Sequence, residues 1–289
     1  MALSIQPTVG ELQQRCVDVR LAVMEEVEVA GSGHYGSSFS LVEILVSLYY
    51  GFLRVRPDQP SWPERDRFIL SKGHGVSALY PILTDLGFFD REHLGTFAQL
   101  GSILGDHPDV KKVPGVDFSS GSLGHGLSAG AGMAEAIRLQ GYDSRVVVVM
   151  GDGEQDEGQV WEAAAYASHR GLAHLLAVTD RNSIQVDGAT SEIMDLSPLA
   201  EKWSAFGWRV IQVDGHDVEA LLGAYRDFDS HRIAEPDGRP TMVIARTVGG
   251  RGVSFIEDQA DWHIGYLEGQ DREAALQEIR SMYGHSEGA

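Results

Sequence analysis

Residues 146–188 read VVVVMGDGEQDEGQVWEAAAYASHRGLAHLLAVTDRNSIQVDG, and this stretch decides the fold. A first apolar run ends at Gly151-Asp152-Gly153, and a second, residues 175–179, ends shortly before Asn182. The pattern predicts a strand over 146–150, a helix near 157–170 and a strand over 175–179. Strands joined by a helix are parallel neighbours. Both polar residues then lie at carboxyl ends of strands, where ligands bind in open α/β sheets.

Asp152 and Asn182 are candidate metal ligands. Ile184, two residues after Asn182, offers a backbone carbonyl as a third oxygen. Carboxylate, amide and carbonyl oxygens suit Mg²⁺ or Ca²⁺ better than zinc, and Mg²⁺ keeps open positions for phosphate oxygens. The amide of Gly153, at a helix start, is a candidate donor to a diphosphate. Each residue alone is also compatible with an ordinary turn, but their joint position favours a site for a phosphorylated cofactor.

The rest of the chain repeats the alternation of strands and helices. Apolar spacing predicts a helix from Leu12 to Ala30, and the G-x-G-x-x-G run 31–36 follows this helix rather than a strand, which argues against a Rossmann nucleotide site. Ser40 and Glu43 have the spacing of a capping box for a second helix, and Ser197-Pro198 and Asp217 are expected to start two later ones. Further strands are expected at 68–70, 209–213 and 242–245, and further helices at 79–86 and 127–139. Residues 101–121 are predicted to be a long loop, which is often functional.

These elements predict one α/β domain over residues 1–289, with a doubly wound, mainly parallel sheet covered by helices on both faces.

Composition narrows the possible partners. The 289 residues carry 23 Lys and Arg against 42 Asp and Glu, a formal net charge of −19. This acidity argues against nucleic acid and anionic membrane as partners. The single cysteine, Cys16, rules out an intrachain disulfide and fits a buried structural thiol. No secretory signal and no apolar run of about 20 residues is present, so a cytoplasmic protein is expected.

Histidines form a second group of candidates. His34, His74, His107, His125 and His263 lie beside glycine, proline or tryptophan in segments without periodicity. For any one of them a structural role is the simpler interpretation, but five in one chain indicate a polar site. The sequence has no H-x-x-x-H or H-E-x-x-H pair, so a zinc site is less favoured.

With these residues the chain resembles the amino-terminal part of transketolases, the domain that binds the diphosphate of thiamine diphosphate. The GDG…N pattern, 152 to 182, is the cofactor motif of that superfamily. The resemblance extends from about residue 10 to residue 280, and the family order is kept in SGH (32–34), DRFILSKGHG (66–75), GDHP (105–108), PGV (114–116), SGSLG (120–124), RTVGGRGVSF (246–255) and Trp262-His263.

The resemblance implies a role for each matching residue. Asp152, Asn182 and the Ile184 carbonyl would bind Mg²⁺, for which Ca²⁺ or Mn²⁺ can substitute. His74, the Gly153 amide and His263 would contact the diphosphate. His34, His107 and His263 would line the substrate channel and carry protons. Gly121 and Leu123 would contact the cofactor rings, and Glu157 would link paired active sites. Tyr35, Arg181 and His125 depart from the family pattern, but none is a proposed metal ligand.

The resemblance also implies a partner. Full transketolases continue into a pyrimidine-binding and a carboxyl-terminal domain, and the glutamate that activates the cofactor lies in the former. The chain is therefore expected to be the amino-terminal subunit of a split transketolase, an α2β2 heterotetramer that moves a two-carbon ketol unit from a ketose or its phosphate to an aldose in carbohydrate and pentose phosphate metabolism. The alternatives are another thiamine-diphosphate carboligase or lyase subunit, such as a deoxyxylulose-phosphate synthase, a specialised sugar or sulfosugar transketolase, a dehydrogenase component, or a noncatalytic scaffold.

Overall fold

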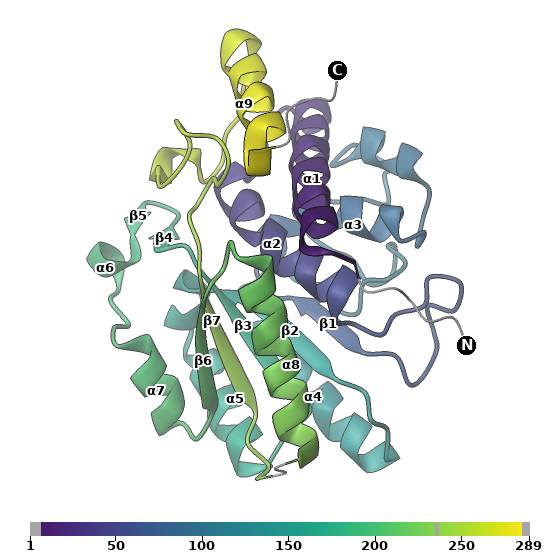
Figure 1. Cartoon of the computed structure of the whole chain (residues 1–289), viewed down its shortest axis with the longest axis vertical. Coiled ribbons are helices and arrows are strands. Elements are labelled where there is room, and N and C mark those ends of the chain that lie inside the picture. The colour runs from purple at the N-terminus through teal and green to yellow at the C-terminus, as the bar shows by residue number, and fades with distance from the viewer. Residues whose placement is uncertain (1–6, 235–236, 285–289) are drawn as a thin grey trace.

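A parallel sheet forms the centre of the computed structural model, which describes residues 7–234 and 237–284 (Figure 1). Across this sheet the order of strands is β1 (Arg67–Leu70), β2 (Val146–Gly151), β3 (Leu175–Arg181), β7 (Thr241–Arg246) and β6 (Arg209–Asp214). The α-helices are α1 (Val9–Ala30), α2 (Tyr35–Gly51), α3 (Tyr80–Asp85), α4 (His125–Gln140), α5 (Gly158–His169), α6 (Thr190–Ile193), α7 (Leu199–Ala205), α8 (Val218–Ala234) and α9 (Gly269–Ser281). Shorter elements are the two-residue strands β4 (Ile184–Gln185) and β5 (Gly188–Ala189) and the 3-10 turns η1 (Gly73–Ala78), η2 (Arg91–Thr96), η3 (Gly153–Asp156), η4 (Ala260–Trp262) and η5 (Met282–Gly284).

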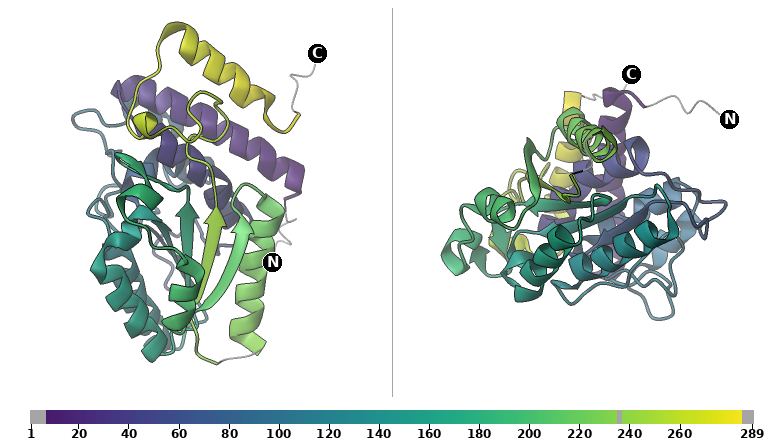
Figure 2. Two further views of the ribbon diagram at one scale, coloured as in Figure 1. Left: turned by 90° about the vertical axis from the view of Figure 1, so that its left-hand side faces the viewer. Right: turned by 90° about the horizontal axis from the view of Figure 1, so that it is seen from below.

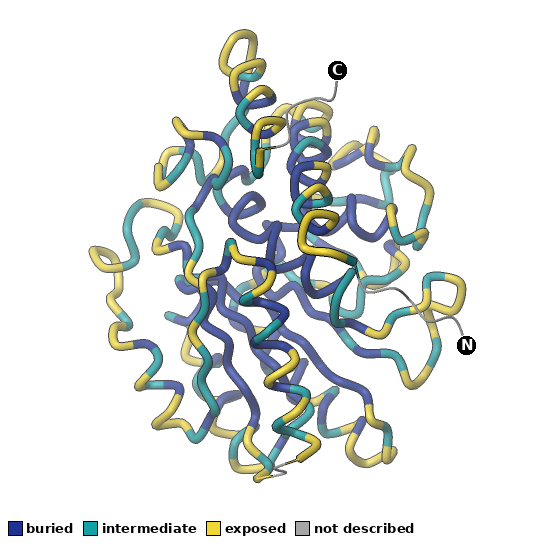
Figure 3. The backbone as a smooth tube through the Cα atoms, in the orientation of Figure 1, coloured by how far each residue is buried: buried dark blue, intermediate teal, exposed yellow. Residues whose placement is uncertain are grey.

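Helices cover both faces of the sheet, as the doubly wound prediction requires. α4 and α5 lie against one face and α2 and α8 against the other, with α1 packed on the outside of α2 (Figures 1 and 2). Because successive side chains of a strand point to opposite faces, alternate valines of β2 enter the two cores. Val147 and Val149 pack with α1 and α2, whereas Val146 and Val148 pack with α4 and α5. β2 is buried over its whole length and β3 over all but its last residue, at the centre of the molecule (Figure 3).

Most predicted elements are confirmed. The central strand–helix–strand unit is β2, α5 and β3, with β2 and β3 paired in parallel from Val146 opposite Leu175 to Gly151 opposite Asp180. Cys16 is a free, buried thiol. Asp217 starts α8 by accepting hydrogen bonds from the amides of Glu219 (2.9 Å) and Ala220 (3.1 Å). Within residues 7–234 and 237–284, no helix is long and apolar enough to cross a membrane.

One predicted helix start and one predicted helix cap are wrong. α2 begins at Tyr35, so Ser40 and Glu43 lie inside it and form no capping box. Their side chains have tertiary partners instead: the Ser40 hydroxyl donates to Asp180 (2.6 Å), and Glu43 forms a buried ion pair with Arg20 (2.6 Å). α7 begins only at Leu199, and its N-cap makes no side-chain hydrogen bond, so Ser197 does not cap it.

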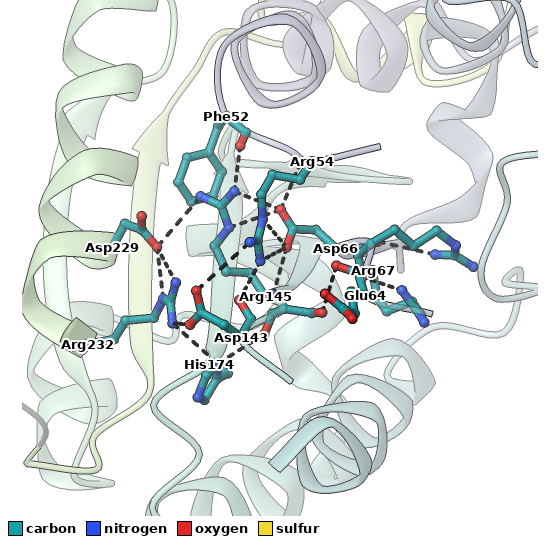
Figure 4. Close-up of polar contacts among 12 residues, drawn as sticks. Phe52, Arg54, Glu64, Asp66, Arg67, Asp143, Arg145, His174, Asp229 and Arg232 are labelled. Atoms are coloured by element: carbon teal, nitrogen blue, oxygen red, sulfur yellow. Dashed lines mark hydrogen bonds and ion pairs between the residues drawn. The ribbon is translucent and has the colours of Figure 1, made fainter. Parts of the chain in front are cut away.

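A dense ionic network closes the amino end of the sheet (Figure 4). The buried carboxylate of Asp66, just before β1, accepts hydrogen bonds from Arg54 (3.1 Å) and from Arg145 (3.0 Å), which precedes β2. Arg145 also donates to the Phe52 carbonyl (2.9 Å) and stacks its guanidinium 4.0 Å from the centre of the Phe52 ring. These bonds fasten the amino ends of β1 and β2 to the segment that follows α2.

Candidate active site

A cavity of about 320 Å³ lies at the carboxyl end of the sheet. Segments that follow β1, β2 and β3 line it, together with residues near the start of α2 and before α9. Every residue predicted for the metal, the diphosphate, the cofactor rings or the substrate channel lines this one cavity: His34, His74, His107, Gly121, Leu123, Asp152, Gly153, Asn182, Ile184 and His263. Glu157, predicted at a subunit interface, is exposed and lies outside the cavity lining, at the N-cap of α5.

Asp152 and Asn182 meet where β2 and β3 end. Asp152 Oδ1 accepts from the Gly153 amide (3.0 Å) and Oδ2 from the Ser183 amide (2.7 Å), which ties the two strand ends together. The Asn182 side-chain oxygen accepts from the Ile184 amide (3.1 Å). Burial, with Asp180 adding its negative charge, raises the pKa of Asp152 to about 6. A carboxylate whose ionisation is opposed in this way gains from a bound cation.

The oxygen atoms available as metal ligands at this point suit Mg²⁺ together with a diphosphate. They are oxygens from one carboxylate, one amide and one main-chain carbonyl, so a six-coordinate cation still needs oxygens from a ligand or water. Two buried polar atoms of the cavity lining, Ser37 Oγ and Gln185 Nε2, have no hydrogen-bond partner within the described residues. Unpaired buried polar groups are costly, and a ligand rich in oxygen atoms would satisfy them. A Cβ at position 153 would lie 2.7 Å from the Gln185 Cβ, so only glycine keeps the main chain this close.

Three histidine rings form a tight cluster in the cavity. The ring centres of His34, His74 and His263 are 5.2, 5.4 and 5.6 Å apart. Burial, with His263 and His107 adding, lowers the pKa of His34 to about 4. Burial followed by Lys72 lowers the pKa of both His74 and His263. These imidazoles are therefore neutral near pH 7 and can accept as well as donate a hydrogen bond.

His107 comes from the long loop that the sequence predicted to be functional. Its Nδ1 lies 3.2 Å from Asp106. Gly121 packs against the His107 ring, since a Cβ at position 121 would lie 3.4 Å from its Cδ2. Tyr80 holds the main chain of this loop by donating its hydroxyl to the Gly105 carbonyl (3.0 Å).

Sequence reasoning missed several polar residues of the cavity: Ser37, Lys72, Glu154 and Gln185, and Asp180 behind them. Glu154 is buried and accepts from the amides of Gly124 (2.9 Å) and Gly151 (3.1 Å), so it joins the start of α4 to the end of β2. This role was not predicted, because acidic residues are common at the start of a helix and Glu154 is one of several there.

The three departures from the family pattern lie in different surroundings. Tyr35 is buried and packs its ring 5.6 Å from Phe39. Arg181 is the last residue of β3 and His125 the exposed first residue of α4.

Comparisons with known proteins agree with this geometry. The family model described as "Transketolase, thiamine diphosphate binding domain" matches residues 12–287. The 6-deoxy-6-sulfo-D-fructose transketolase subunit SqwG of Clostridium sp. (strain MSTE9) is 41% identical over 269 residues, which are 93% of this chain and 96% of that subunit. An apulose-4-phosphate transketolase subunit of Phocaeicola vulgatus is 40% identical over 260 residues, 90% of each chain.

Solved structures and longer relatives match this chain over only part of their own length. A transketolase variant from Pichia stipitis superposes with a TM-score of 0.86 and 29% identity, covering 94% of this chain and 41% of that one. Human transketolase is 36% identical over 265 residues, 91% of this chain and 41% of its own length. The chain thus spans about two fifths of these proteins and nearly the whole of the two subunits. It belongs to the transketolase family, as a thiamine diphosphate-binding domain.

Proposed function

We propose that the chain is the diphosphate-binding subunit of a two-chain transketolase, which transfers a two-carbon ketol unit from a ketose or ketose phosphate to an aldose or aldose phosphate. The observation that carries this proposal is the single cavity lined by all the predicted metal, diphosphate and substrate residues. The match in length to two proteins named as transketolase subunits supports the split architecture.

In this proposal the end of β2 and the segment after β3 hold the cofactor's charged end. Asp152, Asn182 and the Ile184 carbonyl bind Mg²⁺, with Ca²⁺ or Mn²⁺ as substitutes. His74, His263 and the Gly153 amide, which also donates to Asp152, contact the diphosphate. When bound, thiamine diphosphate supplies the carbon nucleophile and the electron sink for breaking and making the bond next to a ketose carbonyl.

Neutral imidazoles supply the proton carriers. His34, His107 and His263 line the route to the reacting centre, and the lowered pKa of His34 and of His263 keeps these rings free to accept a hydroxyl proton at neutral pH. Gly121 and Leu123 pack against the cofactor rings. The chain's part of the reaction is thus to position the cofactor, exclude water and relay protons.

In this proposal a separate partner subunit completes the active site. The pyrimidine-binding and carboxyl-terminal domains of a second polypeptide would cover the cavity and bring the activating glutamate to it. Exposed Glu157 is available for a subunit contact at the same edge. We propose an α2β2 heterotetramer working in the cytoplasm.

Reconstitution tests the proposal. The chain alone, a candidate partner subunit alone and the mixture are assayed for ketol transfer with thiamine diphosphate and Mg²⁺. The donor panel includes fructose 6-phosphate, xylulose 5-phosphate and 6-deoxy-6-sulfo-D-fructose. We expect turnover only in the mixture. Rapid transfer by the isolated chain would refute the split architecture, and cofactor binding without transfer from any donor would favour a different carboligase or lyase.

A further inference from the structure

A lysine that the sequence did not single out enters the cavity from the segment after β1. Lys72 lines the cavity, its side chain is only 3% exposed, and its Nζ lies 2.6 Å from Asp180 Oδ2. Its stem passes over the end of β2, where a Cβ at position 151 would lie 3.8 Å from the Lys72 Cδ. Gly151 and Asp180 are opposite each other in the β2–β3 pairing. The ammonium group therefore lies at the carboxyl ends of β2 and β3, the strands that Asp152 and Asn182 follow.

Asp180 holds this lysine, and both of its carboxylate oxygens already accept hydrogen bonds within the chain. Its carboxylate is fully buried. Oδ2 accepts from Lys72 and from the Ser40 hydroxyl (2.6 Å), and Oδ1 accepts from the Thr247 hydroxyl. α2, the β1–η1 segment and the segment after β7 thus converge on one carboxylate. Asp180 is a positioning residue rather than a cation ligand.

Lys72 keeps unused hydrogen-bonding capacity. An ammonium group has three N–H donors, and within the described parts of the chain Asp180 is the sole hydrogen-bond partner of Nζ. Since the side chain is almost wholly buried, the other donors cannot all be satisfied by bulk water, and leaving them unmade is costly. An acceptor in the cavity would complete them.

Charge identifies the kind of acceptor. Among the described residues that line the cavity, Lys72 is the only lysine or arginine. Burial leads the lowering of pKa at His34, His74 and His263, so these rings bring no fixed positive charge at pH 7. Asp152 and Glu154 bring negative charge to the same cavity. A polyanion here depends on the metal and on Lys72 for compensation.

We infer that Lys72 is a direct ligand of the cofactor's diphosphate and that Asp180 holds its ammonium group in position. The inference rests on the proposed function, since the anion is the diphosphate of that cofactor. In this inference Lys72 Nζ would contact the diphosphate, and the Asp180 carboxylate would hold Nζ in place.

A double-mutant cycle separates ligation from simple neutralisation of Asp180. Titration calorimetry with inorganic diphosphate and Mg²⁺ compares the full-length chain with Lys72→Met, Asp180→Asn and the double variant. Lys112→Met is the control, because it removes one positive charge from a side chain that is 60% exposed. Thermal unfolding of each protein is recorded in parallel.

We expect Lys72→Met and the double variant each to weaken diphosphate binding by about 10- to 100-fold, as for loss of a charged hydrogen bond. The control Lys112→Met should lose less diphosphate affinity than Lys72→Met. Asp180→Asn should also lose less, because it keeps the ammonium group of Lys72. The double variant should unfold later than Lys72→Met because no unpaired buried carboxylate remains. Should Lys72→Met fail to fold, the double variant alone gives the answer.

Two results have opposite meanings. Wild-type affinity in the double variant would overturn the inference, because Lys72 would then only neutralise Asp180. No diphosphate binding by the wild-type chain would instead contradict the cofactor site, and the inference with it.

Discussion

The two ends of the central sheet are both rich in charged and polar side chains, yet they differ in how these side chains are satisfied. At the amino end, Asp66 and Arg145 are buried and each has several partners within the chain. At the carboxyl end, Ser37 and Gln185 leave buried polar atoms unpaired within the described residues, and burial opposes the ionisation of Asp152.

This difference separates stability from function. A saturated network has nothing left to offer a ligand, and removing one of its members leaves a buried charge uncompensated. An unsatisfied cluster costs free energy in the unliganded protein and regains it when a ligand binds. Both ends of the sheet carry buried polar side chains. The site is therefore identified by which of these side chains lack hydrogen-bond partners, and not by their polarity.

The largest expected effect is at the carboxyl end. Asp152→Ala should abolish metal-dependent thiamine diphosphate binding in the assembled enzyme, a loss greater than the ~10- to 100-fold typical of an outer-shell partner of a metal site. Calorimetric titration with and without Mg²⁺ measures it. Asp143→Ala, which removes an exposed carboxylate at the amino end, is the matched control and should bind normally. Unchanged affinity in Asp152→Ala would eliminate the metal assignment.

Asp66→Ala should have the complementary effect. It leaves the buried guanidinium of Arg145 with only the more distant Asp229 carboxylate (3.7 Å), so the free energy of unfolding should fall by about 3–5 kcal/mol. Urea unfolding followed by tryptophan fluorescence measures this, with Asp143→Ala expected to lose at most ~1 kcal/mol, because Asp143 is exposed and Arg232 keeps Asp229 as a second carboxylate partner. The folded fraction of Asp66→Ala should keep wild-type cofactor affinity, and a large loss of affinity would break the separation of the two ends.

Metal binding should weaken in mild acid. The pKa of Asp152 is raised to about 6, chiefly by burial, and the metal binds the ionised carboxylate. Affinity should therefore be constant above this pKa and fall by about tenfold per pH unit below it. Titrations between pH 5 and 8 give the profile. A flat profile across this range would show that another group provides the charge.

Glu26 tests whether an unpaired buried group always indicates a site. It lies in α1, outside the cavity lining, and both carboxyl oxygens lack hydrogen-bond partners within the described residues. Burial, with Glu25 adding, raises its pKa well above the ordinary value, so the folded state keeps the proton and loses stability as pH rises above the unfolded pKa.

Glu26→Met should therefore raise the free energy of unfolding by about 1–3 kcal/mol at pH 8 and by less near pH 4.5. Glu25→Met on the same helix, whose side chain is 64% exposed, should change it by less than ~0.5 kcal/mol. Urea unfolding at the two pH values measures both. A pH-independent gain, or reduced cofactor binding in Glu26→Met, would show that the group has a different role.

Local pattern was sufficient for the strands, for most helices and for the position of the cavity. The apolar runs before Asp152 and Asn182 fix the two strand ends, and parallel pairing then brings these residues together. The histidines could be grouped as candidates from their surroundings, whereas their roles came from the family resemblance.

Long-range contacts account for what the sequence did not reveal. Ser40 and Glu43 have the spacing of a helix cap, but their partners, Asp180 and Arg20, are 140 and 23 residues away. Lys72 and Asp180 are separated by 108 residues, and Asp180 directly follows the strand predicted over residues 175–179. Neither spacing nor composition shows that two such side chains meet.

Hydrogen exchange of the chain with thiamine diphosphate and Mg²⁺ tests the division between the two ends most directly. We expect slower exchange at the carboxyl end, in segments 71–75, 151–154 and 182–186, only when cofactor and metal are both present. Segments 54–67 and 143–146 at the amino end should be unchanged. Protection at the amino end, or none at the carboxyl end in a sample that binds the cofactor, would contradict the account.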